Sequence, residues 1–285
     1  MAMQVIDIHP HVISTDEKRY SRDPLGGKQS GWSLERPVST EQMIAAMDDA
    51  GVAKSALVHS STCYGFDNSY VADAVAAFPK RFTGVGSVDM RAPDAPGKIR
   101  YWVGRGMAGL RIFTAGSTME GQGDWLADPK SFPAWECAGE LRLPVCVQMR
   151  LAGLPMLKVL LDRFPHVTII IDHLLRVPVE EGPPYAQSQG LFDLAKHRNI
   201  FLKLTTNNAR DVKKGKASAQ TFFRRAVDEF GSSRIAWGSN FPASTGSLRQ
   251  LLDESREALS FLPQKDQEQI FGGTALALYP VLAAQ

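Results

Sequence analysis

The sequence has few cysteines and no strong excess of either charge. Its three cysteines, Cys63, Cys137 and Cys146, are unevenly spaced and form no Cys-x-x-Cys pair, which argues against a disulfide framework and a structural zinc site. The 32 Lys and Arg residues nearly balance the 30 Asp and Glu residues, giving a net charge of +2. Neither a basic surface for nucleic acid nor an acidic tail is visible. We therefore expect a small-molecule ligand and a reducing compartment.

Long hydrophobic runs are also absent. No apolar stretch approaches the length of a membrane span. The first apolar run begins within a few residues of Met1, which leaves no room for a secretory signal. These features predict a cytoplasmic protein that neither enters nor crosses a membrane.

Apolar runs of strand length alternate with longer amphipathic segments, a pattern typical of repeated βα units. With 285 residues and 44% hydrophobic content, the chain suits one (β/α)8 TIM barrel, an α/β fold, as a single domain over residues 1–285. The eight predicted strands are Val5–His9, Ser55–His59, Phe82–Val88, Gly109–Phe113, Pro144–Gln148, Val167–Asp172, Ile200–Leu204 and Ile235–Gly238.

Three predicted helices have recognisable ends. Ser39 precedes Met43–Ala50, which stops at Gly51; Asn68 precedes Val71–Phe78; and Ser218 precedes Phe222–Phe230, which stops at Gly231. Small polar residues cap helix starts, and glycine commonly follows helix ends.

The carboxyl ends of the predicted strands carry polar side chains, and active sites of TIM barrels lie at these ends. His9 and His11 are two residues apart, so a strand would project both to one face. For Asp89, Arg150 and Lys203, a solvated loop position is an equal alternative. The polar residues at strand ends are His9, His11, His59, Asp89, Arg111, Gln148, Arg150, Asp172, His173, Arg176, Lys203, Ser239 and Asn240.

Several of these residues belong to motifs that resemble the amidohydrolase-related (amidohydrolase 2) family of barrel hydrolases. Within this family, the chain resembles the branch that contains 2-pyrone-4,6-dicarboxylate lactonase and other sugar-acid and dicarboxylate lactonases. The matching segments are Asp7-Ile8-His9-Pro10-His11, Asp67-Asn68, Gly109-Leu110-Arg111, Ile171-Asp172-His173-Leu174 with Arg176, Leu202-Lys203 and Trp237-Gly238-Ser239-Asn240-Phe241-Pro242. They extend from the first strand to the segment after the eighth.

The resemblance implies a hydrolase in which His9, His11 and His173 surround the scissile carbonyl. It also implies that Arg111 and Arg176 bind a substrate carboxylate, which suits the paired hydrogen bonds of a guanidinium. For Arg111, a buried ion pair with Asp89 or Asp7 is the alternative. The remaining candidates for substrate contact are Gln148, Arg150, Tyr64 and Trp32.

The chain departs from the family after the eighth strand, where Asn240 stands in place of an aspartate that serves as a metal ligand or general base. An amide is not a useful base. The base has moved, the activity has changed, or the substitution is inactivating. His59 is the first alternative base because an imidazole titrates near neutrality, although it could equally be bonded to a loop backbone. Asp89 is second, and Asp172 is third because alternation turns it away if His173 faces inward.

We expect no metal cofactor. His9, His11 and His173 could supply three zinc ligands, but Gln148 and Asn240 stand where many metal-dependent relatives place a histidine and an aspartate. Without an anionic ligand, a divalent ion such as zinc would bind weakly on the three histidines. The lactonase branch is regarded as acting without a metal.

Two long connections, Ile13–Val38 and Thr114–Pro129, predict loops over the carboxyl-terminal face. Trp32, Tyr64 and Trp125 could line the pocket, although Trp125 better suits an anchor to the barrel surface. Tyr185, on a third loop, could add to the pocket or stand at a subunit contact.

The leading hypothesis is a hydrolase that opens a lactone, or related cyclic ester, of a small carboxylated compound in catabolism. A metal-dependent lyase, either a decarboxylase or a hydratase acting on an aromatic acid, is the second hypothesis. A catalytically silent barrel that binds a small acid is the third, motivated by Asn240. A homodimer would be compatible with each.

Overall fold

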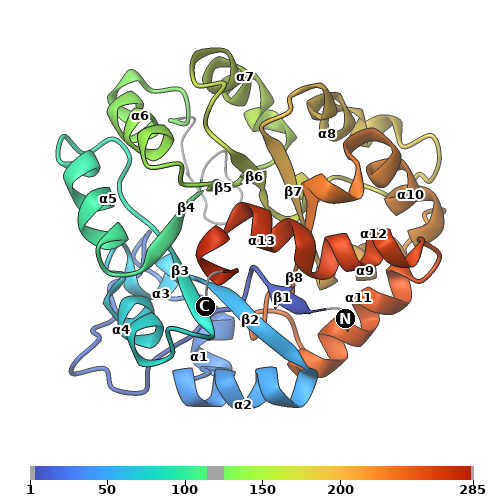
Figure 1. Ribbon diagram of the computed structural model, residues 1–285. Helices are drawn as coiled ribbons and strands as arrows, with labels where there is room; N and C mark the ends of the chain where they lie inside the picture. Colours follow the sequence, from blue (N-terminus) through green and yellow to red (C-terminus); the bar gives the residue numbers. More distant parts are fainter. Residues whose placement is uncertain (1–3, 114–124, 284–285) are drawn as a thin grey trace.

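The computed structural model describes residues 4–113 and 125–283, which form a barrel of parallel strands (Figure 1). Each strand pairs with the next in the sequence. The barrel closes where the Ile8 amide donates to the Trp237 carbonyl oxygen at 3.2 Å. The strands are β1 (Val5–Asp7), β2 (Val52–Val58), β3 (Phe82–Gly86), β4 (Met107–Phe113), β5 (Val145–Gln148), β6 (Ile169–Ile171), β7 (Ile200–Thr205) and β8 (Ile235–Gly238).

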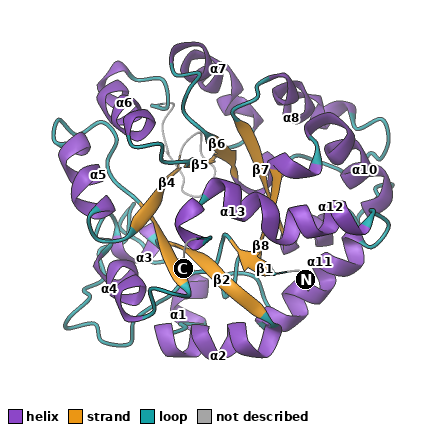
Figure 2. Ribbon diagram, in the orientation of Figure 1, coloured by secondary structure: helices purple, strands orange, loops and turns teal. Residues whose placement is uncertain are grey.

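Helices surround the strands (Figure 2). Within the described ranges, no helix is long and apolar enough to cross a membrane. The α-helices are α1 (Gly31–Glu35), α2 (Thr40–Ala50), α3 (Ser61–Tyr64), α4 (Ser69–Ala77), α5 (Ala95–Val103), α6 (Phe132–Glu140), α7 (Leu154–Arg163), α8 (Gln189–Phe192), α9 (Thr206–Asp211), α10 (Ala219–Phe230), α11 (Leu248–Leu259), α12 (Gln264–Glu268) and α13 (Thr274–Leu278).

The predicted caps of α2 and α10 are confirmed. The Ser39 hydroxyl accepts from the Gln42 amide, and the Gln42 side chain accepts from the Ser39 amide, which forms a capping box. Gly51 ends α2 with φ of 73°, a conformation that favours glycine. The Ser218 hydroxyl accepts from the Thr221 amide at the start of α10. Asn68 precedes α4 without capping it, because its amide bonds to both backbone groups of Ser87.

Two apolar clusters hold the barrel together. The larger one lies between the strands and the surrounding helices. The smaller one fills the barrel from its amino-terminal end, where Ile6, Val85 and Ile170 meet Leu278 and Tyr279. Figure 1 shows α13 lying across this end. Among the described residues, the barrel is therefore blocked at its amino-terminal end, which places a site at the carboxyl-terminal end.

All eight predicted strands are present, but some ends differ. The β8 bounds match the prediction, whereas β1 ends at Asp7 and β6 at Ile171, so His9 and Asp172 lie beyond their strands. The first predicted loop contains α1, which carries Trp32. Most of the second predicted loop, Thr114–Pro129, lies outside the described residues.

Candidate active site

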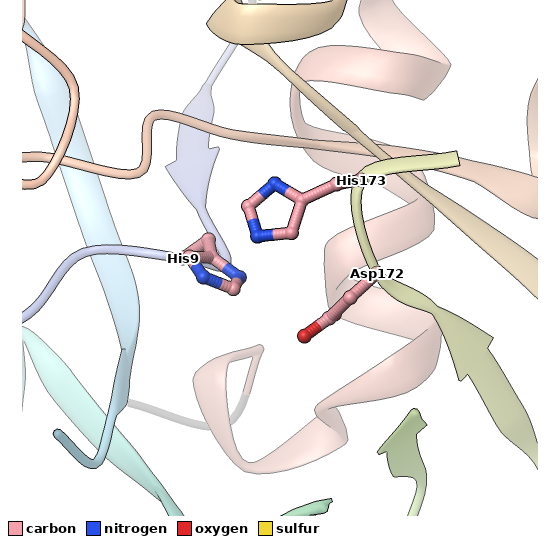
Figure 3. A group of neighbouring side chains, drawn as sticks. All are labelled: His9, Asp172 and His173. Carbon is pink, nitrogen blue, oxygen red and sulfur yellow. The ribbon is translucent and has the colours of Figure 1, made fainter. Parts of the chain in front are cut away.

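Three histidines meet at the carboxyl-terminal end of the barrel. The ring centroid of His9 lies 5.0 Å from that of His11 and 4.8 Å from that of His173. All three side chains are buried. Figure 3 shows the imidazoles of His9 and His173 side by side, with the Asp172 carboxylate near them. Three of the four histidines that the sequence singled out, His9, His11 and His173, therefore form one cluster.

A left-handed turn brings His173 into this cluster. Residues 173–176 follow β6 with φ of 53°, 51°, 58° and 47°. This region costs a residue other than glycine roughly 1–2 kcal/mol, so surrounding contacts must hold the turn. Because the turn abandons strand alternation, His173 and Asp172 both lie at the mouth.

The prediction that Asp172 turns away is therefore wrong. The ligand atoms of His9, Asp172 and His173 lie within 4.8 Å of one another. Each Asp172 oxygen also faces a cation at 2.8 Å, with Oδ1 near Lys203 Nζ and Oδ2 near Arg111 Nε. Burial alone would raise the pKa of Asp172, but Lys203 and Arg111 hold it below its ordinary value.

This ion-pair network corrects two further expectations. Lys203 is fully buried rather than solvated. Arg111 does form a buried ion pair, but with Asp172 instead of Asp89 or Asp7, and its Nη2 also contacts Gln148 Oε1. Two cations face one carboxylate, so the network carries one net positive charge. The barrel interior therefore favours an anion.

His9 has the most open hydrogen-bonding capacity in the cluster. Among the described residues, neither of its ring nitrogens has a partner, although the side chain is fully buried. Burial lowers the pKa of His9 well below its ordinary value, and the charges of Lys203 and Arg111 lower it further. A neutral imidazole carries one N–H, so His9 has a donor available for a ligand at neutral pH.

His11 and His173 each use one ring nitrogen. His11 Nδ1 lies 2.8 Å from the Val58 carbonyl oxygen and must donate to it, which leaves Nε2 with the lone pair. Burial lowers the pKa of His11 to about 3. His173 Nδ1 lies 3.0 Å from Thr205 Oγ1. Burial lowers its pKa well below the ordinary value, so both rings are neutral at pH 7.

His59 and Tyr64 lie on the β2 side. His59 Nε2 donates to the Gly65 carbonyl oxygen at 2.9 Å, the backbone bond that was the alternative to a base role. Burial lowers the pKa of His59 to about 4. The Tyr64 hydroxyl accepts from the Ser14 amide and from Arg22 Nη1, so it supports the loop after β1.

Asn240 is held at the end of β8 in a left-handed conformation with φ of 58°, which asparagine tolerates. Its Nδ2 donates to Ser244 Oγ, which in turn donates to Asn207 Oδ1. This chain fixes the amide orientation and assigns Oδ1 as an acceptor. Nearby, Asp7 Oδ1 accepts from the amides of His9 and Ser239, and burial raises the pKa of Asp7 to about 6.

Positive side chains surround the turn after β6. Arg150 and Arg176 are exposed, and neither forms an ion pair within the described residues. Partial burial of the Arg176 guanidinium lowers its pKa, and the charges of Arg111 and Arg150 lower it further. On the opposite side, the Trp32 ring lies 5.2 Å from that of His11.

One group of described residues has the spacing of metal ligands, but its carboxylate already faces two cations. The group with suitable spacing contains His9, Asp172 and His173, rather than the expected His9, His11 and His173. Both Asp172 oxygens already face cations at 2.8 Å. A bound dication would displace those ion pairs and be repelled by Lys203 and Arg111.

Sequence reasoning missed Thr205 and the structural role of Asp7. A buried role for Lys203 had a signal, because it is the sole charged residue in the apolar run Ile200–Leu204. Thr205 had none, since a threonine at a strand end is ordinary and its partner, His173, is 32 residues away.

A TIM barrel with buried histidines at its carboxyl-terminal mouth has the architecture of a barrel enzyme, because the active sites of this fold lie at that end. The sequence pattern of the amidohydrolase family matches residues 6–281. The chain therefore belongs to the amidohydrolase family.

Two curated relatives are named as lactone hydrolases. The L-fucono-1,5-lactonase of Burkholderia ambifaria is 26% identical over 290 residues, covering 97% of this chain and 95% of that protein. The 4-sulfomuconolactone hydrolase of Rhizobium radiobacter is 28% identical over 207 residues, covering 72% of this chain and 66% of that protein. These relatives support a lactone hydrolase.

Solved structures share the fold. A probable 2-pyrone-4,6-dicarboxylic acid hydrolase of Acinetobacter baumannii, with citric acid bound, has a TM-score of 0.76 at 17% identity, covering 98% of this chain and all of that one. An amidohydrolase of Burkholderia multivorans with bound zinc has a TM-score of 0.77 at 18% identity, covering 97% and 99%. A 2,6-dihydroxybenzoate decarboxylase from Rhizobium has a TM-score of 0.71 at 16% identity, covering 98% and 99%.

Proposed function

We propose that this protein hydrolyses a lactone that carries an acidic group, without a metal. The main support is His9, whose two buried ring nitrogens have no partner among the described residues. A buried donor without a partner costs about 1–3 kcal/mol, so the site is arranged for a ligand oxygen. The lactone carbonyl oxygen accepts this N–H, which polarises the carbonyl.

Water supplies the nucleophile. Asn240 Oδ1 accepts a hydrogen bond from the water and orients it, while a neutral histidine removes its proton. The water oxygen bonds to the carbonyl carbon, the ring C–O bond breaks, and the histidine returns the proton to the leaving oxygen. Both His11 and His173 lie beside His9, and each has Nδ1 on a protein oxygen, so that Nε2 can accept a proton when Nδ1 carries the ring hydrogen. We assign the base role to His173.

The arginines support an acidic substrate. The names of the two curated relatives differ in this respect, since one describes a sugar lactone and the other a sulfonated lactone. In the described part of this chain, Arg150 and Arg176 have no carboxylate partner, and the buried network beneath them is positive. A substrate carboxylate or sulfonate would offset this charge. Trp32 and Gln148 complete the proposed pocket wall.

The first test combines metal analysis with an activity panel. The purified protein is analysed for metal, and turnover of sugar lactones and carboxylated lactones is measured before and after chelation. We expect substoichiometric metal, chelator-resistant turnover and a preference for the carboxylated lactones. Stoichiometric metal with chelator-sensitive turnover would overturn metal independence. Release of carbon dioxide from an aromatic acid would favour a lyase, and binding without turnover would favour a silent barrel.

A second test separates the acidic group from the lactone. Arg176→Gln is compared with wild type on a carboxylated lactone and on the same ring without the carboxylate. We expect KM to rise about 10-fold or more for the first substrate and to change little for the second, because a charged hydrogen bond is lost only in the first complex. Equal effects on both substrates would remove the carboxylate role of Arg176.

A further inference from the structure

The hydrogen bonds behind His173 determine which of its nitrogens carries the proton. Thr205 lies at the end of β7 and is fully buried, and its Oγ1 is 3.0 Å from His173 Nδ1. A hydroxyl can donate to an imidazole nitrogen or accept from one. The direction follows from the other bond that Thr205 makes.

Asn208 settles that direction. Its Nδ2 donates to the His173 carbonyl oxygen at 3.0 Å, and its Oδ1 accepts from the Thr205 amide at 2.9 Å. Both contacts require the same orientation of the amide group. The Oδ1 atom also lies 3.0 Å from Thr205 Oγ1, and two acceptors at that separation would repel each other. The Thr205 proton therefore points to Asn208, and Thr205 accepts from His173 Nδ1–H.

We infer that Thr205 and Asn208 are positioning residues that hold His173 as its Nδ1–H tautomer, leaving Nε2 as the proton acceptor. The inference rests on the proposed function for the role of His173 in turnover. The tautomer itself follows from the hydrogen bonds alone. The bond at one ring nitrogen fixes the state of the other, as is general for catalytic histidines.

Asn208 also stabilises the backbone of His173. Its bond to the His173 carbonyl oxygen anchors the first residue of the left-handed turn. Four successive left-handed residues other than glycine persist only where the surroundings hold them. One buried side chain thus fixes both the backbone and, through Thr205, the protonation of His173.

The tautomer can be measured directly in the full-length protein. Histidine side chains are labelled with nitrogen-15, and long-range proton–nitrogen correlations distinguish a protonated ring nitrogen from one with a lone pair. His173→Gln identifies the signals. We expect wild-type His173 to carry its proton on Nδ1. A proton on Nε2 would overturn the inference without requiring any variant of Thr205.

Two matched variants test the role of the hydroxyl. Thr205→Val removes it and Thr205→Ser retains it. We expect Thr205→Val to shift His173 toward the Nε2–H tautomer and lower kcat by about 10- to 100-fold with little change in KM. This is at or below the lower end of what a positioned base contributes, because the base is still present. We expect Thr205→Ser to keep the tautomer and most of kcat. Near-ultraviolet circular dichroism checks that both variants fold.

The outcomes separate the two proposals. Loss of kcat in Thr205→Val with an unchanged Nδ1–H tautomer would overturn the positioning role. Wild type could also lack lactone turnover while His173 changes from Nδ1–H in wild type to Nε2–H in Thr205→Val. In that case the positioning inference stands and the proposed function fails.

Discussion

At the scale of single residues, the barrel interior depends on Asp172 and the two cations beside it. Lys203 and Asp172 are both fully removed from solvent and 2.8 Å apart. Their attraction offsets the cost of burying each charge, so neither residue is dispensable alone. Burial, together with the positive charges of Lys203 and Arg111, keeps the pKa of His9 well below its ordinary value.

Lys203→Met should therefore destabilise the protein by about 3–5 kcal/mol, because Asp172 would lose one of its two partners. Adding Asp172→Asn should not restore this loss, because the Asp172 carboxylate still pairs with Arg111 at 2.8 Å and its removal would leave that buried guanidinium without a counter-charge. Urea unfolding measures both variants. Lys158→Met, which removes an exposed ion pair with Asp162, serves as the control and should change stability little. An equal effect of Lys158→Met and Lys203→Met would contradict the role assigned to the buried pair.

At the scale of elements, helix ends show where local sequence and structure disagree. Helix α6 ends with the Arg142 amide bonded to the Gly139 carbonyl oxygen and the Leu143 amide bonded to the Ala138 carbonyl oxygen. This is a Schellman motif, in which glycine usually occupies the left-handed position. Here that position is Arg142, with φ of 54°.

Arg142→Gly should stabilise the protein by about 1 kcal/mol, because glycine adopts this conformation without steric cost. Arg142→Ala is the matched control and should bring no such gain, since alanine keeps the steric conflict. Thermal unfolding compares the two, and turnover should be unchanged in both. A similar stability for both variants would mean that the backbone at Arg142 is unstrained.

The loop after β1 offers a second test at this scale. Tyr64→Phe leaves the Ser14 amide and Arg22 without their shared acceptor, at a cost of about 1–3 kcal/mol for a buried group. We expect faster hydrogen exchange over residues 14–22. Tyr70→Phe is the control, because its hydroxyl accepts from the Thr40 amide at the start of α2. Unchanged exchange in the loop of Tyr64→Phe would show that other contacts hold it.

The elements were more predictable from sequence than the contacts among them. Strand β8 and the cap at Ser39 are encoded locally, by an apolar run and by a hydroxyl before a helix. The orientation of Asp172 was not predictable, because it depends on the left-handed turn that follows. Glycine is the usual sequence signal for such a turn, and none occurs among His173, Leu174, Leu175 and Arg176. The partner of Arg111 was equally hidden, since it lies 61 residues away.

At the scale of the whole molecule, the buried histidines make stability depend on pH. Burial lowers the pKa values of all four in the folded state. Below the unfolded pKa of about 6.5, the unfolded chain binds more protons than the folded one. The free energy of unfolding therefore decreases as the pH is lowered, by on the order of 1 kcal/mol per histidine per pH unit. Asp7 acts oppositely, because its raised pKa of about 6 makes the folded state bind its proton first. The combined effect of the four histidines on stability is larger than the opposing effect of Asp7, so the protein loses stability in acid.

We therefore expect the free energy of unfolding to drop by several kcal/mol between about pH 7 and about pH 5.5, as measured in urea at each pH. Asp7→Asn keeps an acceptor for the amides of His9 and Ser239 but removes the opposing titration, so its loss in acid should be steeper. A wild-type protein equally stable at both pH values would mean that the folded and unfolded chains bind the same number of protons over this range, which would contradict the lowered pKa values of these histidines.

Among the described residues, helix α13 closes the amino-terminal end of the barrel, so the carboxyl-terminal end is its opening. A reactant must enter, and its product must depart, through this same opening. Ring opening of a lactone creates one more carboxylate than the reactant had, and that new anion forms above a positively charged interior. The positive charge that attracts the reactant binds the product more strongly, because the product carries one more negative charge. Release of the opened acid, rather than bond cleavage, would then limit kcat, and its rate would increase with ionic strength.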